Sequence, residues 1–159
     1  MAALAERVVI ADGAMGTMIQ DVAPSLDDFE QHEGCNEILN VSRPDIIESI
    51  HRAYLDTGID AVETNTFGAN WSNLSDYGID DRIEELARAG AQIARRAVDA
   101  AEATDGRMRW VLGSMGPGTK LPSLGHTTYG HLNETFAVQA RGLIDGGADA
   151  LLIETSQDL

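Results

Sequence analysis

Apolar positions follow two alternating patterns along the chain. Short, mainly apolar runs occupy residues 8–11, 60–64, 109–113 and 150–153, and between the later runs apolar residues recur every three to four positions. Short apolar runs bounded by turn residues are typical of strands that are covered on both faces, whereas the longer spacing is typical of one helix face. The pattern therefore predicts four strands joined by helices.

Three helices are expected, at about residues 44–58, 81–106 and 128–146. Asp81 and Glu84 resemble a capping box at the start of the second helix, while Gly130 and Gly142 weaken the third. The stretch at residues 12–33 is polar and acidic, and no helix is expected directly after the first strand.

The predicted order, in which strands and helices alternate, is that of a parallel α/β sheet covered by helices. The sequence GIDA at residues 58–61 recurs as GADA at residues 147–150, each time between the end of a helix and a strand. Because glycine ends helices in many folds, this repetition supports the fold and indicates no function.

Composition narrows the class of protein. The chain has 159 residues and a formal net charge of −15, which repels nucleic-acid phosphates and anionic membrane surfaces. Cys35 is the single cysteine, so neither an internal disulfide nor a cysteine-based structural zinc site is expected. With no signal-peptide pattern and no run of about 18 apolar residues, a reducing, cytoplasmic location is expected.

Polar residues follow each predicted strand. Ligands of parallel α/β sheets bind at the carboxyl ends of the strands, so these residues are candidates for a site. Carboxylates there would attract an ammonium group and exposed backbone N–H groups a carboxylate, which favours a small zwitterion such as an amino acid. The candidates are Asp12, Gly13, Glu63, Thr64, Asn65, Ser114 and Glu154.

Structural roles remain open for several of these residues. Asp12 before Gly13 is also typical of an Asx turn, Asn65 of a turn cap, and Glu63 and Glu154 of structural pairing at strand ends.

The glycine-containing turn after the first predicted strand gives no signal for nucleotide binding. Residues 13–16 lack the dinucleotide fingerprint and the lysine of a P-loop, so nucleotide binding is not expected.

The remaining chemically distinctive side chains are expected to be structural. Met15 and Met18 are interpreted as packing residues and Cys35 as an inert thiol. The four histidines are isolated or poorly spaced for metal binding, and we interpret them as surface or capping groups. They are His32, His51, His126 and His131.

Four strand-end motifs, in this order, resemble the homocysteine S-methyltransferase family. They are DGAMGT at residues 12–17, ETNTFG at 63–68, GSMGP at 113–117 and IET at 153–155. Residues 35–40 (CNEILN) and the stretch 111–125 look most like the cobalamin-dependent members of that family. The resemblance covers essentially the whole chain.

The resemblance implies a (β/α)8 TIM barrel that binds L-homocysteine at its C-terminal rim. Residues 1–159 would be the N-terminal half of that barrel, about four βα units, truncated after the fourth strand. By position, Asp12 and Glu154 would hold the substrate ammonium and Gly13 and Ala14 would offer backbone groups. Asn65 and Ser114 would line the same rim, with Glu63 as a further possibility.

The resemblance also implies cofactors and partners for a longer parent protein. There, zinc would bind the homocysteine sulfur, and methylcobalamin, recharged from 5-methyltetrahydrofolate, would donate the methyl group. The family's zinc cysteines would lie beyond Leu159, and Cys35 matches none of them. No catalytic residue, metal site or bound cofactor is therefore expected in this chain, which would be inactive without the folate, cobalamin and reactivation domains.

Other functions remain open at this point. A cobalamin-independent homocysteine methyltransferase, with S-methylmethionine or betaine as donor, would share the same residues. Alternatively, the chain is an inert, self-associating half-barrel, because unpaired edge strands and an exposed apolar face favour a homodimer that closes eight strands. A phosphate-binding barrel is disfavoured, since the usual phosphate loops follow the seventh and eighth strands.

Overall fold

Three short parallel strands form the sheet of this protein, as seen in a computed structural model in which residues 2–156 are described. Their order in the sheet is β1 (Ala61–Glu63), β2 (Trp110–Met115) and β3 (Ala150–Ile153). Val62 lies opposite Val111, and Ser114 lies opposite Leu152. Strands alternate with helices, which confirms the predicted α/β class and three of the four predicted strands.

The segment predicted as the first strand forms only one isolated parallel bridge, between Ala11 and Ala61. Two backbone N–H groups near β1 donate to Ile10 O, at 2.8 and 3.2 Å, and Asp12 N donates to Ala61 O at 3.1 Å. Val8 and Ile10 are 80% and 57% exposed, so little packing supports a longer strand. The prediction is thus right in position and wrong in extent.

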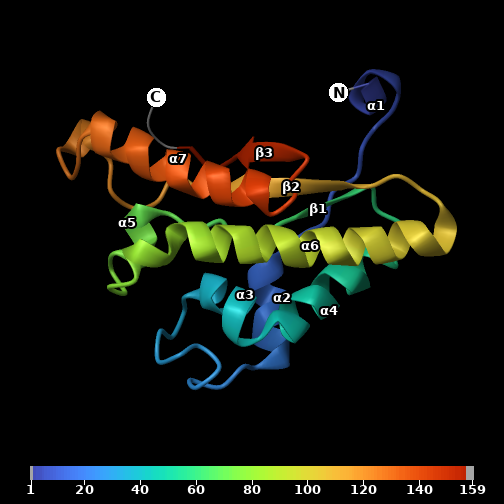
Figure 1. Cartoon of the computed structure of the whole chain (residues 1–159), viewed down its shortest axis with the longest axis horizontal. Helices are drawn as coiled ribbons and strands as arrows, with labels where there is room; N and C mark the ends of the chain where they lie inside the picture. The colour runs from blue at the N-terminus through green and yellow to red at the C-terminus, as the bar shows by residue number, and fades with distance from the viewer. Residues whose placement is uncertain (1, 157–159) are drawn as a thin grey trace.

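Helices α4 (Pro44–Leu55), α6 (Ile83–Asp105) and α7 (Tyr129–Asp145) correspond to the three predicted helices. Figure 1 shows α6 running alongside the sheet, with α7 and β3 on one side and α2 (Met15–Val22), α3 (Leu39–Ser42) and α4 on the other. Leu55, Val62, Val98 and Val111 pack in one buried cluster, which joins α4 and α6 to the strands.

Glycines allow α7 to approach α6 closely. A Cβ at Gly142 would lie 2.8 Å from Glu84 O, and one at Gly146 would lie 2.6 Å from Ala91 Cβ. Gly142, which weakens the helix by propensity, is therefore required by the packing. The helix begins as predicted, because the Thr128 side chain accepts a hydrogen bond from His131 N.

The predicted capping box of Asp81 and Glu84 does not form. Residues Asp80–Arg82 make a 3₁₀ turn, η2, so the N-cap position of α6 falls on Arg82, which makes no side-chain cap. Arg82 instead pairs with Glu85 at 2.7 Å.

Several short elements were not predicted. They are α1 (Ala2–Glu6), α2, η1 (Asn36–Ile38), α3, α5 (Trp71–Leu74) and η3 (Pro122–Leu124). Of these, α2 contradicts the expectation that no helix directly follows the first strand. Its residues Met15, Met18 and Ile19 pack against the cluster that contains Ile47 and Ile50, which confirms the packing role of the two methionines.

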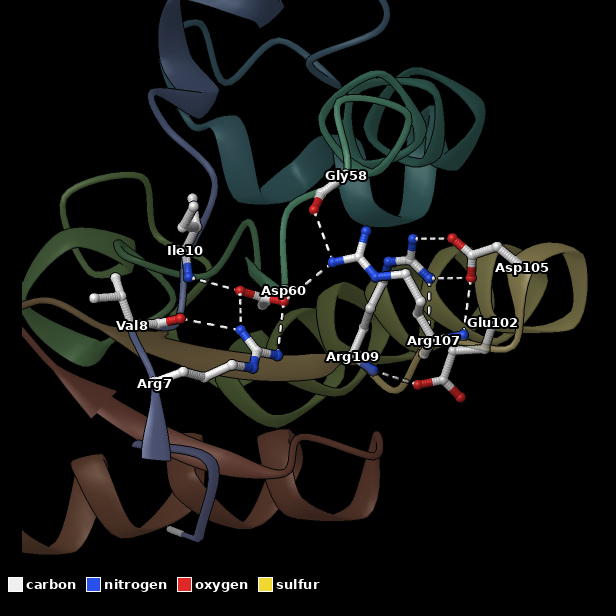
Figure 2. A network of polar contacts seen from close by, with 9 residues as sticks. All are labelled: Arg7, Val8, Ile10, Gly58, Asp60, Glu102, Asp105, Arg107 and Arg109. Atoms are coloured by element: carbon white, nitrogen blue, oxygen red, sulfur yellow. Dashed lines mark hydrogen bonds and ion pairs between the residues drawn. The ribbon is translucent and has the colours of Figure 1, made fainter. Parts of the chain in front are cut away.

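A polar network fastens the N-terminal segment to the amino end of β1 (Figure 2). The buried Asp60 carboxylate accepts two hydrogen bonds from Arg7, at 2.8 and 2.9 Å, and one from Ile10 N at 3.0 Å. Arg107 adds a further contact at 3.3 Å. By holding Ile10 beside β1, the network places Asp12 next to the carboxyl end of that strand.

Apolar surface remains exposed on the sheet. On the face opposite α6, Trp110 and Leu112 line a hollow of about 340 Å³ together with Leu4 and Val9. In the edge strand β3, Ile153 is 73% exposed. No described helix is long and apolar enough to cross a membrane.

Candidate functional site

The carboxyl ends of the strands meet at a hollow of about 320 Å³, which we call the rim hollow. Every site residue predicted from the sequence lines it, namely Asp12, Gly13, Ala14, Glu63, Asn65, Ser114 and Glu154. The structure thus brings these residues together, while their individual binding roles stay predictions.

Asp12 joins two segments at the rim. Its Oδ1 accepts a hydrogen bond from Glu63 N at 2.9 Å, so its side chain links the first segment to β1. Burial raises the pKa of Asp12 to about 7, and the nearby negative charge of Glu63 acts in the same direction. Near neutral pH, this carboxyl group is therefore divided between its charged and neutral forms.

Glu63 and Glu154 bring two further carboxylates to the same place. Burial raises the pKa of Glu63, and the charge of Glu154 raises it further. Ser114 Oγ donates a hydrogen bond to Glu154 Oε1 at 2.6 Å and thereby fixes the direction of that side chain. Among the described residues, none that lines the hollow is basic. The cluster therefore lacks a positive charge that a ligand ammonium group could supply.

Helix α2 starts at the wall of the hollow, where Gly13, Ala14, Met15 and Gly16 line it. Ala14 occupies the N-cap position and provides no side-chain cap, so backbone N–H groups of the first turn remain available. Tyr54 holds this turn by donating a hydrogen bond from its hydroxyl to Ala14 O at 3.1 Å. Such a helix start next to carboxylates offers both halves of a zwitterion site.

A usable sequence signal for α2 existed. Met15, Met18, Ile19 and Val22 are spaced as i, i+3, i+4 and i+7, the period of one helix face. Two glycines, which disfavour a helix, and the adjacent acidic stretch make that period difficult to recognise in the sequence.

The loop after β1, residues 64–70, is almost entirely buried, and sequence reasoning missed the groups that hold it. Glu37 Oε1 accepts a hydrogen bond from Gly68 N at 2.7 Å, and Glu37 itself lines the rim hollow. Burial raises the pKa of Glu37. Phe67 is the exception in this loop, since it is 41% exposed and lies at the hollow. Asn65 does not cap a turn; its side chain hydrogen-bonds to the segment at residues 36–40.

Two other sequence interpretations have clear outcomes. Cys35 is buried, its Sγ donates to Glu37 Oε2 at 3.7 Å, and burial raises its pKa to about 12, which agrees with an inert thiol. His51 is fully buried in α4, so its interpretation as a surface or capping group is wrong.

The described residues do not fit a metal centre. Within residues 2–156 there is no group of three or more His, Cys, Asp or Glu side chains that could hold a metal ion. The thiol of Cys35 faces Glu37, and the side chain is packed in a buried cluster with Ile38 and Leu74. No zinc chemistry can be derived from these side chains.

Parallel strands that alternate with helices, and whose carboxyl ends surround an acidic hollow, place this protein among α/β proteins with a candidate ligand site at the strand ends. The model of the family described as homocysteine S-methyltransferase matches residues 9–159, and the chain belongs to that family.

Two curated relatives are the proteins named methionine synthase of Mycobacterium tuberculosis (strain ATCC 25618 / H37Rv) and Mycobacterium leprae (strain TN). Each is 58% identical over 156 residues, which is 98% of this chain. The chain spans only 13% of the length of either relative.

Solved structures of the homocysteine methyltransferase MmuM from Escherichia coli share the fold. The metallated form matches with a TM-score of 0.79 and 23% identity, over 99% of this chain and 57% of that protein. The oxidized form matches with a TM-score of 0.73 and 21% identity, over 94% and 54% respectively. The chain thus corresponds to about half of that fold.

Proposed function

We propose that this chain is the homocysteine-recognising part of a methionine synthase, a 5-methyltetrahydrofolate–homocysteine methyltransferase. Residues 1–159 would form the N-terminal half of its (β/α)8 barrel. The observation that carries the proposal is the meeting of Asp12, Glu63 and Glu154 with the start of α2 in one hollow that no described basic residue lines.

Recognition follows from the charges of the hollow. The ammonium group of L-homocysteine would be held by Asp12 and Glu154, with Ser114 keeping Glu154 in position. The ligand carboxylate would accept hydrogen bonds from backbone N–H groups at Gly13 and Ala14. With both charged groups held, the thiol-bearing arm would point away from the rim carboxylates, toward the group that reacts with it.

Methyl transfer would need groups beyond this chain. In the parent enzyme, zinc would hold the sulfur as a thiolate and methylcobalamin would supply the methyl group, with 5-methyltetrahydrofolate as the ultimate donor. Because the described residues do not fit zinc, no step of the transfer is assigned to them. The folate, cobalamin and reactivation domains of the parent would be its partners.

Calorimetric titration of L-homocysteine into the chain under reducing conditions tests the proposal. Binding should occur with or without zinc and be lost in the double variant Asp12→Asn/Glu154→Gln. The matched control, Asp80→Asn/Glu134→Gln, removes the same charges at exposed positions and should bind normally. Equal binding by both double variants would overturn the proposal.

The exposed edges support a second proposal, that the isolated chain self-associates. Val8 and Ile10 at one edge of the sheet and Ile153 at the other are more than half exposed, so a homodimer could cover them. Size-exclusion chromatography with light scattering should show a dimer. A monomer that remains stable on dilution would contradict it, without bearing on homocysteine recognition.

A further inference from the structure

A buried pair of asparagines links the loop after β1 to α3. Asn65 in the loop is 5% exposed, and Asn40 in α3 is 3% exposed. Asn65 Nδ2 donates a hydrogen bond to Asn40 Oδ1 at 3.0 Å, and Asn40 Nδ2 donates to Asn65 O at 2.8 Å. Both ends of the Asn40 amide therefore contact Asn65.

Backbone carbonyl groups fix the direction of each side-chain amide. Asn40 Nδ2 also donates to Leu86 O at 3.2 Å, and Asn65 Nδ2 also donates to Asn36 O at 2.8 Å. A carbonyl oxygen only accepts, so each amide must turn its nitrogen toward it and its oxygen the other way. A half-turn of either amide would place oxygen against oxygen.

Close packing holds this arrangement. A Cβ at Gly90 in α6 would lie 2.6 Å from Thr66 Cγ2 and 2.8 Å from Asn40 Nδ2, so the helix backbone packs directly against Asn40 and the residue that follows Asn65. On the other side of the loop, Thr66 Oγ1 donates to Ser114 O at 2.8 Å. Asn40 and Thr66 are therefore held closely, and the two hydrogen bonds from its nitrogen fix the direction of the Asn65 amide.

We infer that Asn40 is a positioning residue that makes Asn65 present its side-chain oxygen, and not its nitrogen, to the rim hollow. Asn65 lines the hollow while its nitrogen is held by Asn36 and Asn40. An amide oxygen accepts a hydrogen bond from ammonium, whereas an amide NH₂ group only donates and cannot bind ammonium in this way. Asn40 thus favours ligands that carry an ammonium group. This inference rests on the proposed homocysteine recognition and extends it to selectivity.

The first test compares two ligands that differ only in the ammonium group, L-homocysteine and 4-mercaptobutanoate, by calorimetry. In Asn40→Ala, the Kd for L-homocysteine should rise about tenfold, since a hydrogen bond to a charged group is lost, while that for 4-mercaptobutanoate should stay within about twofold. The control is Val98→Ala, a buried truncation in the cluster around Val111. It should leave both Kd values unchanged.

The second test needs no ligand. Nuclear magnetic resonance should show slow hydrogen exchange of the Asn65 side-chain amide in the parent chain, faster exchange in Asn40→Ala and no change in Val98→Ala. The signal is assigned by its loss in Asn65→Asp. If Asn40→Ala does not fold, Asn40→Ser replaces it in both tests, because the serine oxygen lies one bond closer to the backbone than the amide oxygen and no longer reaches Asn65 Nδ2.

The outcomes separate the two proposals. Absence of L-homocysteine binding by the parent chain would overturn the proposed function, and exchange of the Asn65 amide would then decide the role of Asn40 alone. Unchanged exchange in the Asn40 variants would overturn the positioning role. Equal weakening of both ligands would overturn the selectivity for ammonium.

Discussion

His51 should make this protein sensitive to mild acid. The ring is fully buried in α4, and neither Nδ1 nor Nε2 has a hydrogen-bond partner among the described residues. Burial lowers the pKa of His51 to about 4 from an ordinary value of 6.5, although the nearby charge of Glu48 acts in the opposite direction. The folded protein therefore holds this ring neutral under conditions in which the unfolded chain protonates it.

The sign and size of the effect follow from linkage. With a lowered pKa in the folded state, the full contribution of His51 to stability is present above pH 6.5 and is lost as the pH falls toward 4. Between pH 7.5 and pH 4.5 the folded state should lose roughly 2 to 3 kcal/mol through this residue alone. That loss is a large part of the stability of a small domain.

Other groups titrate in the same range, so the measurement must be a difference between variants. Asp12 acts in the opposite direction, because its raised pKa lets the folded state bind a proton more readily than the unfolded state. Denaturant unfolding followed by tryptophan fluorescence should be compared for the parent chain, His51→Leu and His51→Gln at each pH. Both variants should gain roughly 2 to 3 kcal/mol relative to the parent between pH 7.5 and pH 4.5.

The two substitutions separate titration from the burial of a polar group. Leucine removes the unpaired polar atoms, whereas glutamine keeps polar atoms that cannot titrate, so the two should differ by an offset that does not change with pH. A parent-to-variant difference that stays constant within about 0.5 kcal/mol over this range would refute the reasoning. It would mean that solvent or a partner reaches the ring in solution.

Three further predictions follow from the site and its supports. L-homocysteine should bind about tenfold more weakly at pH 6 than at pH 8, because protonated Asp12 cannot pair with ammonium; calorimetry on Asp12→Asn should show a flatter profile. Gly90→Ala should lower the free energy of unfolding by about 2 kcal/mol through its clash with Asn40 and with Thr66 in the loop after β1, whereas Gly130→Ala, with no neighbour within 4 Å, should raise it slightly; denaturant titration distinguishes them. Asp60→Asn should lower that free energy by about 2 kcal/mol by removing the charge that Arg7 pairs with, and unchanged unfolding would contradict the role given to this network.

The elements that the sequence predicts well are those with long, uninterrupted periods. Helix α6 carries its apolar stripe over 23 residues, and α4 begins at Pro44, so both were found. Residues 8–11 have the composition of a strand, but strand pairing depends on neighbours, and of the described strands β1 alone pairs with them, through one bridge at Ala11. His51 lies four residues after Ile47 on the buried face of α4, a spacing that could have predicted its burial.

The residues of the candidate site likewise fall into those that the sequence predicts and those that it does not. Asp12, Glu63 and Glu154 could be predicted because each follows an apolar run and parallel strands end at one edge. Glu37 and Asn40 could not, because their contacts with the loop after β1 join segments 25 to 31 positions apart. No local period encodes such contacts, although both residues lie in the CNEILN segment.

Two aspartates at opposite ends of the sheet differ in whether a basic residue pairs with them. At the amino end, the guanidinium group of Arg7 and nearby donors hold the pKa of Asp60 well below its usual range. At the rim, Asp12 is half-buried without a described cation, and its pKa rises to about 7. The first carboxylate is paired with a cation in the fold as it stands, whereas the second would gain a cation only from a ligand. A hollow built this way is less stable when empty, and the ammonium group of a ligand would recover that stability as binding energy.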